Sequence, residues 1–82
     1  MKLNNLRQKI DNIDLEIIRL LDQRMEVCKE VGVFKKENNL QITHANRELE
    51  IISNLSKCSS FTKDEVTSLY EIIFKISKSK QI

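Results

Sequence analysis

The chain has 82 residues, a formal net charge of +2, a single glycine and no proline. This length fits one domain, residues 1–82, near the lower limit of what a single core stabilises. The balanced charge argues against a dedicated nucleic-acid binder, in which a basic stripe and a much higher pI are expected. No apolar run approaches the roughly 20 residues of a membrane span, and the first residues lack the apolar core of a signal peptide. We therefore expect a cytoplasmic protein that binds neither nucleic acid nor membranes.

Metal ligands are sparse in this sequence. Cys28 and Cys58 are far apart, no Cys-x-x-Cys motif occurs, and His44 is the only histidine. Zinc sites need three or four such ligands, usually at short spacings. We therefore expect no metal site, with Cys28 as a small core residue and both thiols free in a reducing compartment.

The first predicted element is one long helix over residues 2–38. Its apolar residues recur at alternating three- and four-residue steps, which is the pattern of a heptad seam. These residues are Leu3, Leu6, Ile10, Ile13, Ile17, Leu20, Val27, Val31 and Phe34. Gly32 inside the helix costs about 1 kcal/mol relative to alanine. Burial of the apolar residues beside Gly32 offsets that cost, so we expect the helix to continue through it.

The length of this helix predicts a dimer. Some 36 residues at about 1.5 Å each form a rod of roughly 54 Å. A compact monomer of this size has a radius of gyration of about 12 Å, so the rest of the chain cannot cover such a rod. We therefore expect a second copy to cover the remaining seam, with the long helices packed on each other.

Two shorter helices account for most of the remaining chain. One spans about residues 44–55 or 56, with Thr43 as its N-cap and an apolar face. Residues 57–61 form the connecting loop. The last helix begins at a capping box of Thr62 and Glu65, in which the hydroxyl and the carboxylate satisfy each other's free backbone donors. The predicted fold class is therefore all-α, with three helices.

Arg24 stands where the apolar seam calls for an aliphatic side chain. It can extend outward to solvent, or set the register of packed helices as polar core residues do in coiled coils. A buried guanidinium instead needs an anion, because leaving it unpaired costs several kcal/mol. Asp22 and Glu26 point away from its stripe, and Lys35 lies closer to its direction. We therefore expect an anion from outside the chain to pair with Arg24.

Other polar residues interrupt apolar faces in the two shorter helices. Ser77 and Gln81 extend the stripe of the last helix at four-residue spacing, although a fraying C-terminus gives the same pattern. Arg47 and Glu48 lie beside the apolar face of the middle helix, where an ordinary surface pair could also stand. Together these residues describe a pocket of cations, neutral hydrogen-bonding groups and one carboxylate, without a nucleophile–base pair or a phosphate loop. Such a site binds a small organic anion and acts by position and electrostatics.

A long spaced pattern covers Leu3 to Gln81. It is carried by the segments LRQKIDNIDLEIIRLLDQRMEVCKEVGVFKK, NRELE and ISKSKQ. This pattern resembles the all-helical class of chorismate mutases. The resemblance implies an intertwined homodimer with two active sites, each built from both chains. It also implies the rearrangement of chorismate to prephenate on the route to phenylalanine and tyrosine, an intramolecular pericyclic step that needs no cofactor.

The resemblance assigns the substrate's two carboxylates to arginines. Arg24 and Arg7, the latter donated by the partner chain, would hold them, while Arg47 and Ser77 would orient the carboxylate side of the pocket. Helix geometry supports the partner's contribution independently. Arg7 and Arg24 lie about 25 Å apart along one helix, which is too far for one small substrate to touch both in a single chain.

The resemblance assigns the reacting centre to other residues. Lys35 and Gln81 would hydrogen-bond the ether oxygen whose bond breaks, and Glu48 would hold the ring hydroxyl. His44 stands where the family commonly has an aspartate, and Gln41 where a proline is common. His44 can still contact the hydroxyl through its backbone N–H, but hydroxyl binding is altered if the family uses the side chain.

Two alternatives to a mutase remain open at this point. An isochorismate–pyruvate lyase uses the same scaffold for a related elimination, although Ser77 and the order Arg47-Glu48 follow the mutase pattern. A non-catalytic helical dimerisation module would explain the apolar seam. It would leave the polar residues Arg24, Lys35, Ser77 and Gln81 unexplained as a group.

Overall fold

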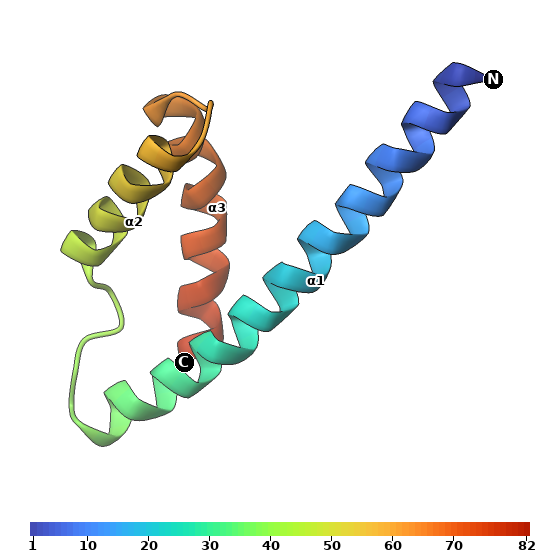
Figure 1. Cartoon of the computed structure of the whole chain (residues 1–82). Helices are drawn as coiled ribbons and strands as arrows, with labels where there is room; N and C mark the ends of the chain where they lie inside the picture. The colour runs from blue at the N-terminus through green and yellow to red at the C-terminus, as the bar shows by residue number, and fades with distance from the viewer.

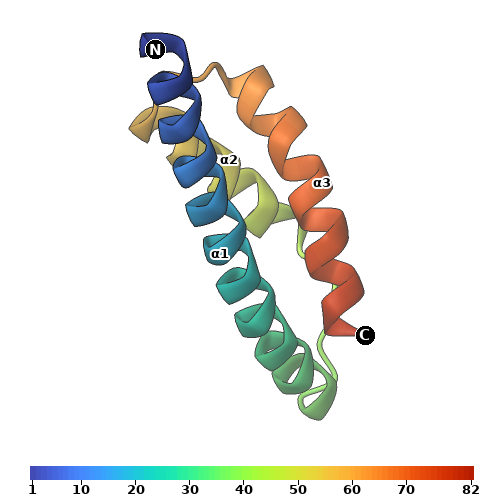
Figure 2. The same ribbon diagram turned by 90° about the vertical axis from the view of Figure 1, so that its right-hand side faces the viewer.

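The computed structural model describes all 82 residues, which form three α-helices and no strand. α1 spans Lys2–Glu37, α2 spans Ala45–Cys58 and α3 spans Lys63–Gln81 (Figure 1). α3 packs on the C-terminal half of α1 and on α2, while the N-terminal half of α1 extends away from this body. In Figure 2, turned by 90°, the C-terminal end of α3 lies beside the C-terminal half of α1. The predicted all-α class with one long N-terminal helix is confirmed.

α1 is continuous through Gly32, as predicted, and ends at Glu37. The expected burial of the apolar residues beside Gly32 is wrong for the single chain, because Val31, Val33 and Phe34 are exposed. The side chain of Asn38 donates a hydrogen bond to the backbone oxygen of Phe34 at 2.8 Å. Asn39 follows in the left-handed region, with φ of 56°, which asparagine tolerates better than most residues. The two asparagines therefore end α1 and turn the chain toward α2.

Two predicted boundaries of α2 are wrong. The N-cap is His44 and not Thr43, and no side chain caps it; the backbone N–H of Glu48 donates to the oxygen of His44, which makes this the first helical bond. α2 also continues to Cys58, beyond the predicted end. The Ser56 hydroxyl donates to the oxygen of Ile52 at 2.7 Å, so this polar residue is satisfied within the helix.

The isolated chain buries few residues. Its core consists of Ile52, Val66 and Phe74, where α2 meets α3. The radius of gyration is 15.8 Å, well above the value of about 12 Å for a compact chain of this length. Residues 1–20 are exposed throughout, and they include most of the apolar seam. Val27, Val31 and Phe34 are exposed as well, so one chain leaves the whole seam of α1 without cover.

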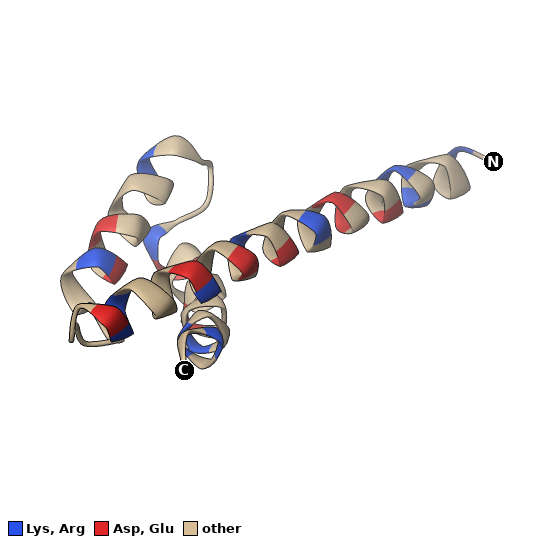
Figure 3. Cartoon of the chain, turned by 90° about the horizontal axis from the view of Figure 1, so that it is seen from below, with Lys and Arg blue, Asp and Glu red and all other residues tan.

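Charged residues of both signs are spread along α1 (Figure 3). Three of the four ion pairs in the chain join residues three apart in one helix and are more than half exposed. Pairs of this kind contribute only a few tenths of a kcal/mol each.

None of the three helices combines the length and the hydropathy needed to cross a bilayer.

The predicted capping box of α3 is confirmed. The backbone N–H of Glu65 donates to the Thr62 hydroxyl at 3.1 Å, and the backbone N–H of Thr62 donates to the Glu65 carboxylate at 2.8 Å. Replacing Thr62 by alanine should lower the free energy of unfolding by about 1 kcal/mol. Urea denaturation at one fixed chain concentration measures this change. Thr62→Ser should keep most of the stability, and equal loss in both variants would contradict a role for the hydroxyl.

Candidate active site

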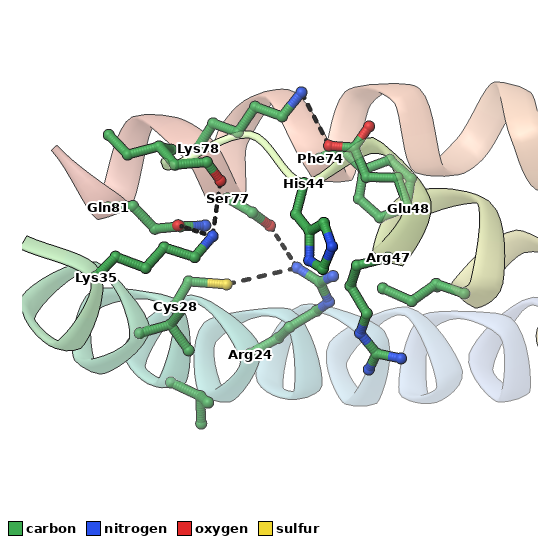
Figure 4. A pocket seen from close by; sticks show the side chains of 14 residues that line it. Arg24, Cys28, Lys35, His44, Arg47, Glu48, Phe74, Ser77, Lys78 and Gln81 are labelled. Atoms are coloured by element: carbon green, nitrogen blue, oxygen red, sulfur yellow. Dashed lines mark hydrogen bonds and ion pairs between the residues drawn. The ribbon is translucent and has the colours of Figure 1, made fainter. Parts of the chain in front are cut away.

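A pocket of about 280 Å³ lies where the C-terminal half of α1, the start of α2 and the end of α3 converge (Figure 4). Its volume is close to the lower end of the range of small-molecule sites. All but one of the eight residues predicted for the site line this pocket. They are Arg24 and Lys35 from α1, His44, Arg47 and Glu48 from the start of α2, and Ser77 and Gln81 from α3.

Arg24 is held in the pocket by neutral partners. Its Nη1 donates to the Ser77 hydroxyl and, at 3.6 Å, to the Cys28 sulfur. Ser77 is buried and donates its own proton to the oxygen of Ile73 at 2.7 Å, which leaves its lone pairs to accept from Arg24. No carboxylate of the chain pairs with Arg24. The hydroxyl and the thiol therefore orient the guanidinium without neutralising its charge. The Arg24 side chain is half-buried rather than fully buried.

Lys35 joins the C-terminal end of α1 to the end of α3. Its Nζ donates to the backbone oxygen of Ile42 at 2.7 Å and to the side-chain oxygen of Gln81 at 3.1 Å. An ammonium group has three N–H donors, so one remains for a ligand. Gln81 accepts through its oxygen and keeps its amide N–H groups free to donate. The two side chains thus offer adjoining donors to an oxygen atom in the pocket.

Arg47 and Glu48 do not form an ion pair with each other, so the alternative that the two make a surface pair is wrong. Arg47 pairs with Glu50 on its own helix, because residues three apart share a helix face whereas adjacent residues do not. Glu48 instead pairs with Lys78 of α3 at 2.9 Å. Lys78 is not among the predicted site residues, because its place among the lysines near the C-terminus favours a solvated last turn. Its three-residue spacing from Gln81 is the sequence signal that could have identified it.

Cys28 lines the pocket and is half-buried, so its prediction as a core residue is wrong. The pocket faces it because α1 presents Arg24 and Cys28, four residues apart, on one side. No group of three or more His, Cys, Asp or Glu side chains is arranged to hold a metal ion. The cationic and neutral hydrogen-bonding groups that line the pocket can bind a small anion.

Gly32 allows the end of α3 to touch α1. A Cβ at this position would lie 2.5 Å from the backbone oxygen of Gln81 and 2.6 Å from its Cα. Real Cβ atoms do not approach backbone atoms so closely, so any side chain here must displace one helix from the other. This contact lies one turn before Lys35, at the place where Lys35 reaches Gln81.

Arg7 is the one predicted site residue that lies outside the pocket. It is exposed on the first turns of α1, which point away from the three-helix body. Because α1 is one continuous helix, Arg7 and Arg24 are separated by about 25 Å along it. Arg7 cannot reach the pocket of its own chain.

Comparison with known proteins shows the family of this chain. Residues 6–82 match the family model for chorismate mutase type II. The chain belongs to the chorismate mutase type II family. It is 30% identical to a chorismate mutase from Methanocaldococcus jannaschii, in an alignment that covers 98% of this chain and 84% of that protein. The resemblance seen in the sequence is thereby confirmed.

Two further proteins are similar to this chorismate mutase type II chain. It is 33% identical over 99% of its length to a bifunctional chorismate mutase/prephenate dehydratase from Aquifex aeolicus, but it spans only 25% of that protein. A solved conserved hypothetical protein from Pyrococcus furiosus superposes with a TM-score of 0.84 at 35% identity, covering 100% of this chain and 97% of the other. The three-helix fold is therefore shared with this solved protein over the whole chain.

Replacing Gly32 by alanine separates helix propensity from helix contact. Alanine favours the interior of α1 by about 1 kcal/mol, but its Cβ collides with the backbone of Gln81. We expect unchanged or higher helicity by circular dichroism together with weaker binding of ligands in the pocket, because Gln81 moves from Lys35. Val33→Ala, at an exposed neighbouring position, is the matched control. Ligand binding by Gly32→Ala equal to that of the control would contradict this role for the glycine.

Proposed function

We propose that the chain is an isomerase that converts chorismate to prephenate in the biosynthesis of phenylalanine and tyrosine. Membership of the chorismate mutase type II family supports this activity, as does the Methanocaldococcus jannaschii relative of similar length. The observation that carries the proposal is the pocket, in which Arg24, Lys35 and Gln81 hold donors that no group of the chain satisfies.

The proposed chemistry follows from where charge develops. As the carbon–oxygen bond to the ring breaks and the new carbon–carbon bond forms, the ether oxygen gains negative charge. Donors aimed at that oxygen bind the transition state more tightly than the ground state. The free N–H of Lys35 and the amide of Gln81 would supply these donors. The reaction stays within one molecule, so it needs neither a nucleophile nor a cofactor.

The cations would select the reactive conformer of the substrate. The enolpyruvyl arm must fold over the ring before the new bond can form, and fixing both carboxylates favours that geometry. Arg24 would hold one carboxylate while Ser77 keeps its guanidinium in place. Arg47 lines the same pocket. Rotation of its side chain away from Glu50 would bring its charge toward the substrate carboxylates. Arg7 of a second copy would hold the other carboxylate.

The ring hydroxyl would bind at the start of α2. Glu48 points into the region between α2 and α3 (Figure 4) and can accept a hydrogen bond from the hydroxyl. His44 precedes the helix as its N-cap, and its backbone N–H makes no hydrogen bond within the chain. This free donor supports a backbone contact, so the histidine can replace the family's aspartate without loss of the interaction.

The site requires an intertwined homodimer. Residues 1–20 are exposed in one chain although they carry a continuous apolar seam. Burying that seam against the same seam of a second copy contributes roughly 25 cal/mol for each Å² of apolar surface removed from water. An antiparallel neighbour would also bring its Arg7 toward Arg24, which one chain cannot do.

Product analysis tests the proposed activity. Purified protein is incubated with chorismate and, in a separate sample, with isochorismate, and the products are identified by NMR against samples that lack protein. We expect prephenate from chorismate at a rate that grows with protein concentration. Release of pyruvate from isochorismate alone would identify a lyase instead. Turnover of neither compound would leave a non-catalytic dimerisation module as the function.

Lys35→Ala tests the mechanism in the same assay. Removing one donor to a developing oxyanion costs about 10²- to 10³-fold in kcat, and we expect a loss of that size with the fold intact by circular dichroism. Lys36→Ala removes the same charge from an exposed neighbouring position and should stay close to the unmodified protein. Equal activity in the two variants would contradict a role for Lys35 at the ether oxygen.

A further inference from the structure

Glu48 and Lys78 form the one ion pair of the chain that joins two helices. The carboxylate comes from the first turn of α2 and the ammonium from the last turns of α3, with 2.9 Å between Lys78 Nζ and Glu48 Oε2. The Lys78 side chain is 35% exposed and the Glu48 side chain 27%. The side chains of the ion pairs within single helices are all more than half exposed. Both residues line the pocket.

A lone carboxylate in this pocket would oppose the proposed ligand. The substrate carries two carboxylates, and Glu48 would stand close to them in a site from which the ligand displaces water. Like charges repel strongly where water is excluded. A side chain that must accept a hydrogen bond from the ring hydroxyl also needs a fixed orientation. A cation beside Glu48 meets both requirements.

We propose that Lys78 is a positioning residue that orients Glu48 for the substrate hydroxyl and neutralises its charge toward the substrate carboxylates. This inference rests on the proposed function. Lys78 contacts Oε2 of Glu48, and no hydrogen bond within the chain uses Oε1. Figure 4 shows the Lys78 ammonium joined to the Glu48 carboxylate, from α3 to α2. The remaining oxygen is thus available to the ligand.

The position of Lys78 on α3 supports a specific role over a general positive surface. Ser77, Lys78 and Gln81 all line the pocket from the last turns of α3. Lys75 and Lys80 lie on the same helix, are exposed, and form no ion pair. Long-range attraction of an anion would use all three lysines, whereas orientation of Glu48 uses Lys78 alone.

A double-mutant cycle in the chorismate assay tests the proposal. Lys78→Met keeps the aliphatic stem and removes the charge, Glu48→Gln removes the partner's charge, and Lys75→Met is the matched control. We expect Lys78→Met to lower kcat/KM about three- to tenfold, given a half-exposed pair, and Lys78→Arg to restore most of it. In the Glu48→Gln background, Lys78→Met should change kcat/KM less than twofold, because the group on which it acts is gone. Lys75→Met should match the unmodified protein.

Several outcomes would overturn the inference. Losses that multiply in the double variant would show that Lys78 acts on the substrate independently of Glu48. An equal loss in Lys75→Met that disappears at high salt would show long-range steering instead. Circular dichroism verifies that each variant folds, and Lys78→Gln replaces Lys78→Met if the latter does not. An unmodified protein without chorismate mutase activity overturns the proposed function and this inference together, whereas multiplicative losses in an active protein overturn the inference alone.

Discussion

An apolar seam that runs along a helix of 36 residues cannot be covered by the rest of an 82-residue chain. α3 packs on the C-terminal half of α1 but leaves Val27, Val31 and Phe34 of the seam exposed, and the pocket forms along that contact. The N-terminal half remains exposed and carries Arg7, which forms no ion pair within its own chain. Under the proposed function, the constraint that calls for a second copy would also place the missing cation of the site on that copy. Stability and catalysis would then depend on one interface.

The pocket is organised before any ligand binds. Arg24 is oriented by a hydroxyl and a thiol, and Lys35 by a backbone oxygen and the Gln81 amide. Neutral partners of this kind fix a cation without cancelling its charge, so little reorganisation is needed when an anion arrives. Gly32 serves the same end, because it lets two backbones approach until the end of α3 meets α1. Positioning of this kind suits a reaction in which the substrate supplies all the reacting atoms.

Local signals in the sequence were sufficient for most of the fold. Heptad periodicity predicted α1, and the Thr62–Glu65 capping box predicted the start of α3 to the residue. The same rules misplaced the N-cap of α2, where Thr43 has the favoured side chain but His44 makes the first helical bond. Just before this start, the Lys35 ammonium donates a hydrogen bond to the backbone oxygen of Ile42, and local propensity does not include such a contact between elements.

The site was predictable only in part. Arg24 was evident because it interrupts an apolar seam, whereas the roles of Lys35 and Gln81 came from the family resemblance. The pairing of Glu48 with Lys78 and the contact of Gly32 with Gln81 join different helices. Contacts of this kind depend on how the helices are placed in space, which the spacing along one helix does not determine. These two contacts are therefore findings of the structure.

The central claim is that each active site is completed by Arg7 of a second copy, and mixing two inactive variants tests it directly. Arg7→Ala and Lys35→Ala are each prepared, then unfolded together and refolded so that chains exchange. In a mixed dimer one site receives both defects and the other receives neither, so random pairing should restore about a quarter of the unmodified activity. If Arg7 acted within its own chain, every site in the mixture would keep one defect. Activity that stays at the level of the separate variants, in a mixture shown to contain mixed dimers, would contradict the account.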